Sequence, residues 1–213
     1  MLIRSAAVAL LALTVSAAAA EPVLTALPAP LETRNPPVVW KATGPDSLTI
    51  VAGPKTNWFV SPWDSTAADN APTLLFRPKG DFTFSAKIAL KPVARWDSGA
   101  LALVIDKDNW AKICFENSVA DGKLSVVMVV NRGISDDSYT AFSSPDNTIY
   151  LRISRQGPAY MFFASRDGKD WTMLRDFTLG GDAALLRTGL LAQSPVGDGM
   201  TVQFSEIRYE VKP

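Results

Sequence analysis

The stretch Asp81–Leu90, DFTFSAKIAL, decides the fold class of this 213-residue chain. Apolar residues occupy every second position from Phe82 onward, and Thr83, Ser85 and Lys87 lie between them. Successive side chains of a β-strand point to opposite faces of its sheet. The pattern therefore predicts a strand with one buried face and one polar face.

Further strand-like segments follow this one along the chain. Ala100–Ile105 is an uninterrupted apolar run, as expected for a strand that is covered on both faces. Four more strands are predicted, at Ala111–Glu116, Lys123–Asn131, Ile149–Arg155 and Ala159–Ser165. Turn-forming sequences separate them: Asp106–Asn109, Asp121–Gly122, Gln156–Pro158 and Asp167–Asp170. Turns this short indicate antiparallel hairpins.

The C-terminal part of the chain completes an all-β pattern. Beyond the first 20 residues no stretch carries a sustained helical stripe, and the best candidate is one short turn in Asp182–Arg187. In the last strand, Val202 and Phe204 are out of phase with Ile207, which predicts a β-bulge around Ser205-Glu206. About a dozen short strands with almost no helix predict a two-sheet antiparallel β-sandwich or jelly roll.

The first 37 residues are interpreted as a leader and an arm. Met1–Ala20 has a basic Arg4, an apolar run and a small-residue end, which is the layout of a secretory signal peptide. Glu21–Pro37 holds five prolines and is interpreted as an extended arm, so that residues 38–213 form the sandwich domain. No later segment approaches the ~20 apolar residues of a membrane helix. We expect a secreted or periplasmic protein without a membrane span.

The composition excludes several classes of function. Basic and acidic residues number 21 each, so nucleic acid is not expected as a partner. The chain has no histidine, which excludes Ser-His-Asp and Cys-His nucleophiles and His-ligated metals. Cys114 is the only cysteine, so no intrachain disulfide can form, and it is interpreted as a packed thiol. No cofactor is expected.

Many short motifs follow one another in order along the chain: Asn57-Trp58-Phe59, Asp69-Asn70-Ala71-Pro72, Gly80-Asp81-Phe82, Trp96-Asp97-Ser98-Gly99, Asn109-Trp110-Ala111-Lys112, Asp121-Gly122-Lys123-Leu124, Leu151–Arg155, Ser165-Arg166-Asp167-Gly168 with Trp171, Ala192-Gln193-Ser194-Pro195 and Gly199. In the order of these motifs the sequence resembles a bacterial and fungal family of domains of unknown function, whose members are concanavalin A-like jelly rolls, sometimes labelled regulation-of-enolase-like. The resemblance spans roughly Trp40 to Tyr209. It implies the fold and, because the superfamily includes lectins and polysaccharide-cleaving enzymes, a carbohydrate-linked role.

The chain departs from the family pattern in the predicted loop Asn131–Ser138. Many members have Ser-Asp-Trp there, whereas Asp137 occupies the aromatic position in this sequence. If that tryptophan stacks on a ligand elsewhere in the family, the contact is lost here.

Candidate polar ligand contacts gather on the predicted strand Ala111–Glu116. Lys112, Cys114 and Glu116 point to one side of it, and the apolar residues point to the other. In a jelly roll such a row often lines the cleft, where Glu116 can bind sugar hydroxyls or act as an acid or base. The alternative is a structural ion pair or a solvated face.

Aromatic and loop residues complete the candidate site. Trp58, Trp63 and Trp96 offer flat faces of the kind that stack on sugar rings, and Trp58 and Trp63 lie among turn formers. Arg132 and Asp136 are candidates for hydrogen bonds to hydroxyls. For each tryptophan the alternative is a place in the core, and for the loop residues it is simple solvation.

The sequence does not provide a catalytic or metal-binding set. Laminarinase-type hydrolases of the superfamily carry two Glu and one Asp at alternate positions of one strand, and this chain has no such row. Asp106 with Asp108 and Asp136 with Asp137 are oxygen donors, but neither run approaches a full calcium ligand set. No catalytic residue and no metal site are therefore predicted.

Three functions follow from these observations. The first is an exported domain that binds a carbohydrate in a concave cleft without catalysis. The second is a carboxylate-dependent glycoside hydrolase or keto-sugar-processing enzyme that uses Glu116. The third is a structural or protein-interaction domain of the cell envelope.

Overall fold

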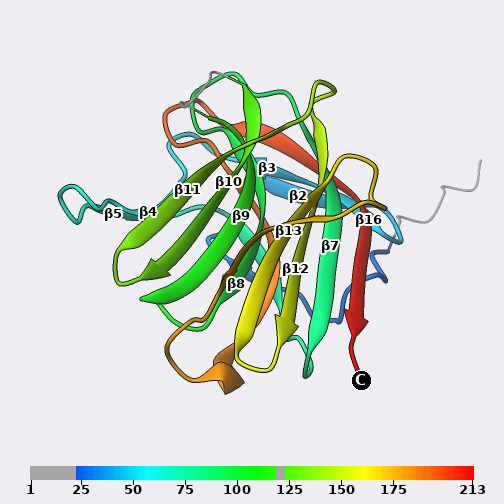
Figure 1. Cartoon of the computed structure of the whole chain (residues 1–213). Coiled ribbons are helices and arrows are strands. Elements are labelled where there is room, and N and C mark those ends of the chain that lie inside the picture. The colour runs from blue at the N-terminus through cyan, green and yellow to red at the C-terminus, as the bar shows by residue number, and fades with distance from the viewer. Residues whose placement is uncertain (1–22, 119–122) are drawn as a thin grey trace, which may run out of the picture.

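The computed structural model describes residues 23–118 and 123–213, so the expected leader and the turn Asp121–Gly122 lie outside it. In these ranges the chain forms two seven-stranded antiparallel sheets that pack face to face, and a separate two-stranded ribbon (Figure 1). A single 3-10 turn, η1 (Ala183–Leu185), lies in the segment predicted to hold one. The prediction of an all-β, two-sheet antiparallel β-sandwich is confirmed.

The two sheets are named A and B and their strands are given in spatial order. Sheet A runs β1 (Glu32–Arg34), β6 (Thr73–Phe76), β15 (Arg187–Gln193), β8 (Ser98–Val104), β9 (Asn109–Asn117), β10 (Leu124–Arg132) and β11 (Ser135–Ser143). Sheet B runs β14 (Thr172–Phe177), β13 (Ala159–Ser165), β12 (Thr148–Gln156), β7 (Phe82–Leu90), β16 (Met200–Val211), β3 (Ser47–Ala52) and β2 (Val39–Gly44). The ribbon consists of β4 (Trp58–Val60) and β5 (Ala67–Asp69).

The main core lies between the sheets and follows the alternation of the sequence. In β7 the predicted apolar face is buried, and in β9 the inward residues Ile113 and Phe115 are fully buried in the same core. Burying one such side chain contributes about 1.5–3 kcal/mol. Because alternate residues point inward, Lys112, Cys114 and Glu116 must point to the outer face of sheet A.

An irregularity in β16 fixes the register of this strand. In β16 the pairing with β7 shifts between Ser205 and Arg208, and Glu206 has a φ of 49°, so the predicted bulge is confirmed. The bulge lets both halves of β16 bury their apolar residues despite the change of phase. Tyr150 donates a 2.7 Å hydrogen bond to the Glu206 carboxylate and so ties the bulge to β12.

The stretch predicted as an extended arm is partly integrated into the sandwich. Leu27 is buried in the core, and Glu32–Arg34 forms β1, which pairs with β6 at one edge of sheet A. A short strand that covers a sheet edge leaves fewer backbone groups unpaired. None of the helical segments in the described ranges has the length and apolar character that crossing a bilayer requires.

The ribbon covers part of the outer face of sheet A and creates a second, smaller core. Trp58 stacks on Trp110 of β9 with ring centroids 4.4 Å apart, and the Arg34 guanidinium lies 4.3 Å from the Trp58 ring centre. Arg34 also pairs with Asp69 of β5. Beyond this anchored base, Figure 1 shows the ribbon extending past the edge of the sheet.

Candidate functional site

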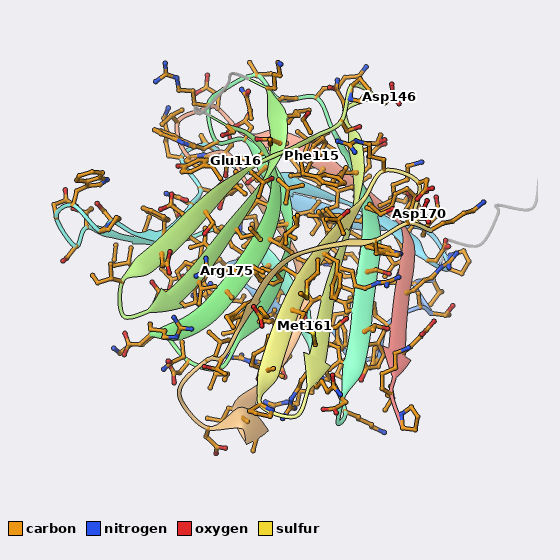
Figure 2. All side chains as sticks on the ribbon, in the orientation of Figure 1. Phe115, Glu116, Asp146, Met161, Asp170 and Arg175 are labelled. Atoms are coloured by element: carbon orange, nitrogen blue, oxygen red, sulfur yellow. The ribbon has the colours of Figure 1, made fainter. Side chains whose placement is uncertain are left out.

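A pocket of about 360 Å³ lies on the outer face of sheet A, bounded on one side by the ribbon. Its floor consists of side chains from three adjacent strands: Lys112, Glu116, Val127, Val129, Asp137 and Tyr139. Figure 2 shows Glu116 near the end of β9. The pocket thus combines polar groups with apolar surface, which a sugar-binding site needs.

Strand register explains why these side chains meet. Lys112 of β9 pairs with Val129 of β10, and Val129 pairs in turn with Asp137 of β11. Tyr139 lies two residues further along β11, in the same row as Cys114. Since alternate residues of neighbouring strands share a face, all of these side chains project outward together.

Lys112 lies almost flat on the floor, with only 2% of its surface exposed. Its ammonium donates a 2.8 Å hydrogen bond to the Gln193 side-chain oxygen at the end of β15. Ala100 and Ala102 lie on the outer face of β8, between β9 and β15. Their small side chains leave room for the lysine stem to cross from one strand to the other.

Glu116 is a buried carboxylic acid of the pocket with a raised pKa. Burial is the main cause of the rise from 4.5 to about 7, the charge of Lys112 opposes it, and repulsion from Asp137 adds to it. In the part of the chain that the structure describes, its carboxyl group makes no hydrogen bond or ion pair. Near neutral pH this group is therefore divided between its neutral and charged forms.

Two other titratable groups share the floor. Burial raises the pKa of the Cys114 thiol to about 12, so the thiol stays protonated and is not a nucleophile. Burial, and then the charge of Asp137, raise the pKa of the Tyr139 hydroxyl above its ordinary value. Tyr139 therefore remains a neutral hydrogen-bond donor at the pocket.

The rim of the pocket consists of loops that a buried carboxylate holds together. Asp97 accepts 2.9 Å hydrogen bonds from the amides of Val93 and Ala94 and a 2.7 Å bond from the Ser194 hydroxyl. Ser194 in turn donates its amide to Thr56, 3.0 Å away. This network joins the segments that bring Trp96, Pro195 and Asn57 to the pocket. Trp96 adopts a φ of 63°, so its backbone depends on this support.

The structure brings together four of the seven predicted ligand-binding residues: Trp63, Trp96, Lys112 and Glu116. Trp63 lies in the turn of the ribbon and is 94% exposed. The pocket also contains Gln193, Asp137 and Tyr139, which are not among these seven. The alternation of Asp137, Tyr139 and Ala141 along β11 is a signal that could have identified two of them, but the predicted loop Asn131–Ser138 covers the start of this strand.

Three predicted contacts lie elsewhere. Trp58 is 2% exposed because it is the wedge between ribbon and sheet, so it cannot stack on a ligand. Arg132 donates to the Thr178 carbonyl at 2.7 Å, and Asp136 pairs with Arg175 of β14 at 2.8 Å. The hairpin turn is confined to Gly133–Ile134, and Asp136 pairs with the inward-facing Val130. Asp136 therefore faces the gap between the sheets, where Figure 2 shows Arg175.

Comparison with known proteins gives the family. The model of the family described as "Protein of unknown function (DUF1349)" matches residues 34–212. The chain belongs to the DUF1349 family. The label regulation-of-enolase-like stays a prediction from the sequence resemblance. No curated protein matches the sequence.

Solved structures similar to this DUF1349 protein share its fold at low identity. A functionally unknown protein from Saccharomyces cerevisiae is 20% identical, with a TM-score of 0.77 over 86% of this chain and 97% of that one. The carbohydrate binding module CBM66 from Bacillus subtilis is 15% identical, with a TM-score of 0.51 over 81% and 91%. The GH43 protein BlXynB from Bacillus licheniformis is 18% identical, with a TM-score of 0.60 over 80% of this chain but 34% of that one. These likenesses confirm the predicted jelly-roll sandwich.

The DUF1349 pocket holds groups suited to binding, and its carboxylates are spread over two strands. Its two carboxylates, Glu116 and Asp137, belong to strands separated by β10, rather than alternating on one strand. Among the described residues no three Cys, Asp or Glu side chains are grouped so that they could hold a metal ion. The pocket therefore offers hydrogen bonds, a buried ammonium and aromatic surface.

Proposed function

We propose that this protein is an exported carbohydrate-binding domain that acts without catalysis. The observation that carries the proposal is the convergence of Lys112 and Glu116 with Trp63 and Trp96 around one pocket. An exposed aromatic ring packs against the apolar face of a sugar ring, while buried polar groups bind its hydroxyls. The pocket supplies both kinds of contact.

Each polar group has a separate part in the proposed complex. Gln193 holds the Lys112 ammonium in place, so its remaining protons are available to a sugar oxygen. Glu116 accepts a hydrogen bond from a sugar hydroxyl. This bond satisfies a carboxyl group that is buried without a hydrogen bond in the described structure. Trp63 provides the stacking surface from the ribbon.

The fold comparisons support this proposal. One similar structure is named as a carbohydrate binding module and another as a GH43 protein. The chain spans only about a third of the GH43 chain, which is why an enzymatic activity is not carried over with the fold. The expected leader at Met1–Ala20 supports export.

Binding to a glycan array, followed by calorimetry on the best ligand, tests the proposal. We expect Trp63→Ala to weaken binding by about fivefold or more, because stacking of one aromatic ring contributes about 1 kcal/mol or more. Trp40→Ala is the matched control, since Trp40 is exposed on β2 of the other sheet. Binding that survives the double variant Trp63→Ala, Glu116→Gln would contradict the site.

One observation favours a second candidate, a carboxylate-dependent enzyme. A glutamic acid with a pKa of about 7 has the protonation behaviour that a general acid needs at neutral pH. Incubation with oligosaccharides and keto-sugars distinguishes the two functions. Product formation that Glu116→Gln abolishes would establish the enzyme, and binding without turnover supports the binding domain. If the protein is a structural domain of the cell envelope, neither product formation nor glycan binding is expected.

A further inference from the structure

The charged groups of the pocket are divided between its two sides. Lys112 extends toward β15, where its ammonium meets Gln193. Asp137 and Tyr139 lie on the opposite side, on β11, and Glu116 acts on both of them electrostatically. The pocket therefore holds one cation that is already hydrogen-bonded and two carboxylates, Glu116 and Asp137.

Glu116 has no cation in direct contact with its carboxylate among the described residues. Glu116 is 5% exposed, and within the described residues it has neither a hydrogen bond nor an ion pair at 4.0 Å or less. Isolating a carboxylate from water without a partner is unfavourable, and a nearby second carboxylate adds repulsion. Asp137 supplies that repulsion. The attraction of Lys112 is larger than this repulsion, but burial outweighs it, so the pKa of Glu116 is still raised toward the neutral form.

The walls of the pocket favour a cation as well. Phe59, Trp63, Trp96 and Tyr139 line it, and the face of an aromatic ring attracts a positive charge. A volume of about 360 Å³ is at the lower end of the ~300–1,000 Å³ of small-molecule pockets, so a short part of a glycan occupies it. With two carboxylates and one cation between aromatic walls, the pocket has an excess of negative charge that suits an ammonium group on a compact ring.

We infer that the pocket selects sugars that carry a free, protonated amino group, with the ammonium placed between Glu116 and Asp137. This inference rests on the proposed carbohydrate binding and names its ligand class. The amine forms charge-assisted hydrogen bonds with the carboxylates, whereas a hydroxyl in the same place forms weaker neutral ones. An acetylated amine has lost the positive charge and presents a bulkier amide.

Three β-1,4-linked pentasaccharides that differ only at C2 test the inference: those of glucosamine, N-acetylglucosamine and glucose. Calorimetry at pH 7 with the full mature chain should show the glucosamine oligomer binding about tenfold or more tightly than the other two, as expected for exchanging a neutral hydrogen bond for a charged one. Equal affinities, or tighter binding of the acetylated oligomer, would overturn the inference.

Matched variants assign the preference to this site. Glu116→Gln and Asp137→Asn keep the shapes of the side chains, and each should reduce the ratio of the affinity for the glucosamine oligomer to the affinity for the glucose oligomer. Asp136→Asn is the control, because Asp136 is adjacent in the chain but pairs with Arg175 outside the pocket. If the preference for glucosamine persists in both Glu116→Gln and Asp137→Asn, or is lost equally in Asp136→Asn, it reflects general charge attraction. Either result overturns the assignment of the preference to this pocket.

Failure of the inference can be told apart from failure of the proposed function. If the glucose or acetylated oligomer binds and the glucosamine oligomer does not, carbohydrate binding stands and amine selection is wrong. If no oligomer binds and the glycan array is also blank, both are wrong. Thermal unfolding of every variant shows whether a loss of binding comes from loss of the fold.

Discussion

The outer faces of the two sheets have similar residue types but opposite environments. On sheet A, the ribbon and rim loops cover Lys112 and Glu116 until each is at least 95% buried. On sheet B, Arg152 lies over the Trp171 ring at 3.7 Å, and Lys87 pairs with Glu206 at 3.9 Å, with side chains that remain partly in water. The same alternation produces both faces. Coverage by a separate segment turns one of them into a pocket.

Removal of the wedge under the ribbon should have the largest effect on this contrast. Trp58→Ala leaves a cavity against Trp110 and should lower the free energy of unfolding by about 3–5 kcal/mol, together with ligand binding. Urea denaturation measures the change. Trp63→Ala, at a side chain that is 94% exposed, should change stability by less than about 0.5 kcal/mol. Equal losses in the two variants would contradict the anchoring role of Trp58.

The second test uses the pH dependence of Glu116. Its pKa is raised from 4.5 to about 7 by folding, so its contribution to stability is fully present below pH 4.5 and is lost as the pH rises through about 7. That shift corresponds to at most about 3 kcal/mol. Glu116→Gln should therefore be more stable than the wild type near pH 8 and similar to it near pH 4. Loss of the attraction between Glu116 and Lys112 reduces the gain in stability of the variant at pH 8. Parallel profiles of stability against pH for the two proteins would contradict the prediction.

The third test compares two aspartates that hold turns on opposite sides of the molecule. Asp97→Asn removes a buried charged acceptor, so stability should fall by about 1–3 kcal/mol and ligand binding should weaken although Asp97 does not line the pocket. Asp167 is the control, since it caps the β13–β14 turn by accepting the amides of Lys169 and Asp170 at 2.8 and 2.9 Å. Asp167→Asn should leave binding unchanged. If calorimetry shows the same ligand affinity for Asp97→Asn and Asp167→Asn, Asp97 has no role in positioning the rim of the pocket.

The smallest effect is expected on the open face of sheet B. Arg152→Met keeps the apolar stem and removes the cation above Trp171, so unfolding should become easier by about 0.5–1 kcal/mol. Glycan binding should be unchanged, because Arg152 lies on the sheet without the pocket. A loss of binding comparable to that of Glu116→Gln would show that the two faces do not differ in function.

The strands could be predicted because alternation is a local property of the sequence. Phe82–Leu90 and Ala111–Glu116 point their residues as the pattern indicated, and the bulge at Ser205-Glu206 followed from a change of phase. Lys112 and Glu116 were placed correctly on the outer face for the same reason. Their shared pocket required the register of β9, β10 and β11, which is a property of the sheet.

The aromatic residues could not be assigned from the sequence alone. Trp58 and Trp63 are five residues apart in similar surroundings, yet one is a buried wedge and the other is almost fully exposed. Only the docking of the ribbon on Trp110 separates them. For Arg132 and Asp136 the error was local, because a two-residue turn at Gly133–Ile134 places Asp136 on a strand with a defined inward direction.

The stacked pair Trp58–Trp110 has a consequence for recognition. The base of the pocket's outer wall is part of the folded core, held by these rings and by Arg34. A ligand therefore meets a wall that is already in position and does not have to order a loose segment. Preorganisation of this kind reduces the entropy lost on association, which favours the proposed binding of small, weakly interacting groups such as sugar hydroxyls.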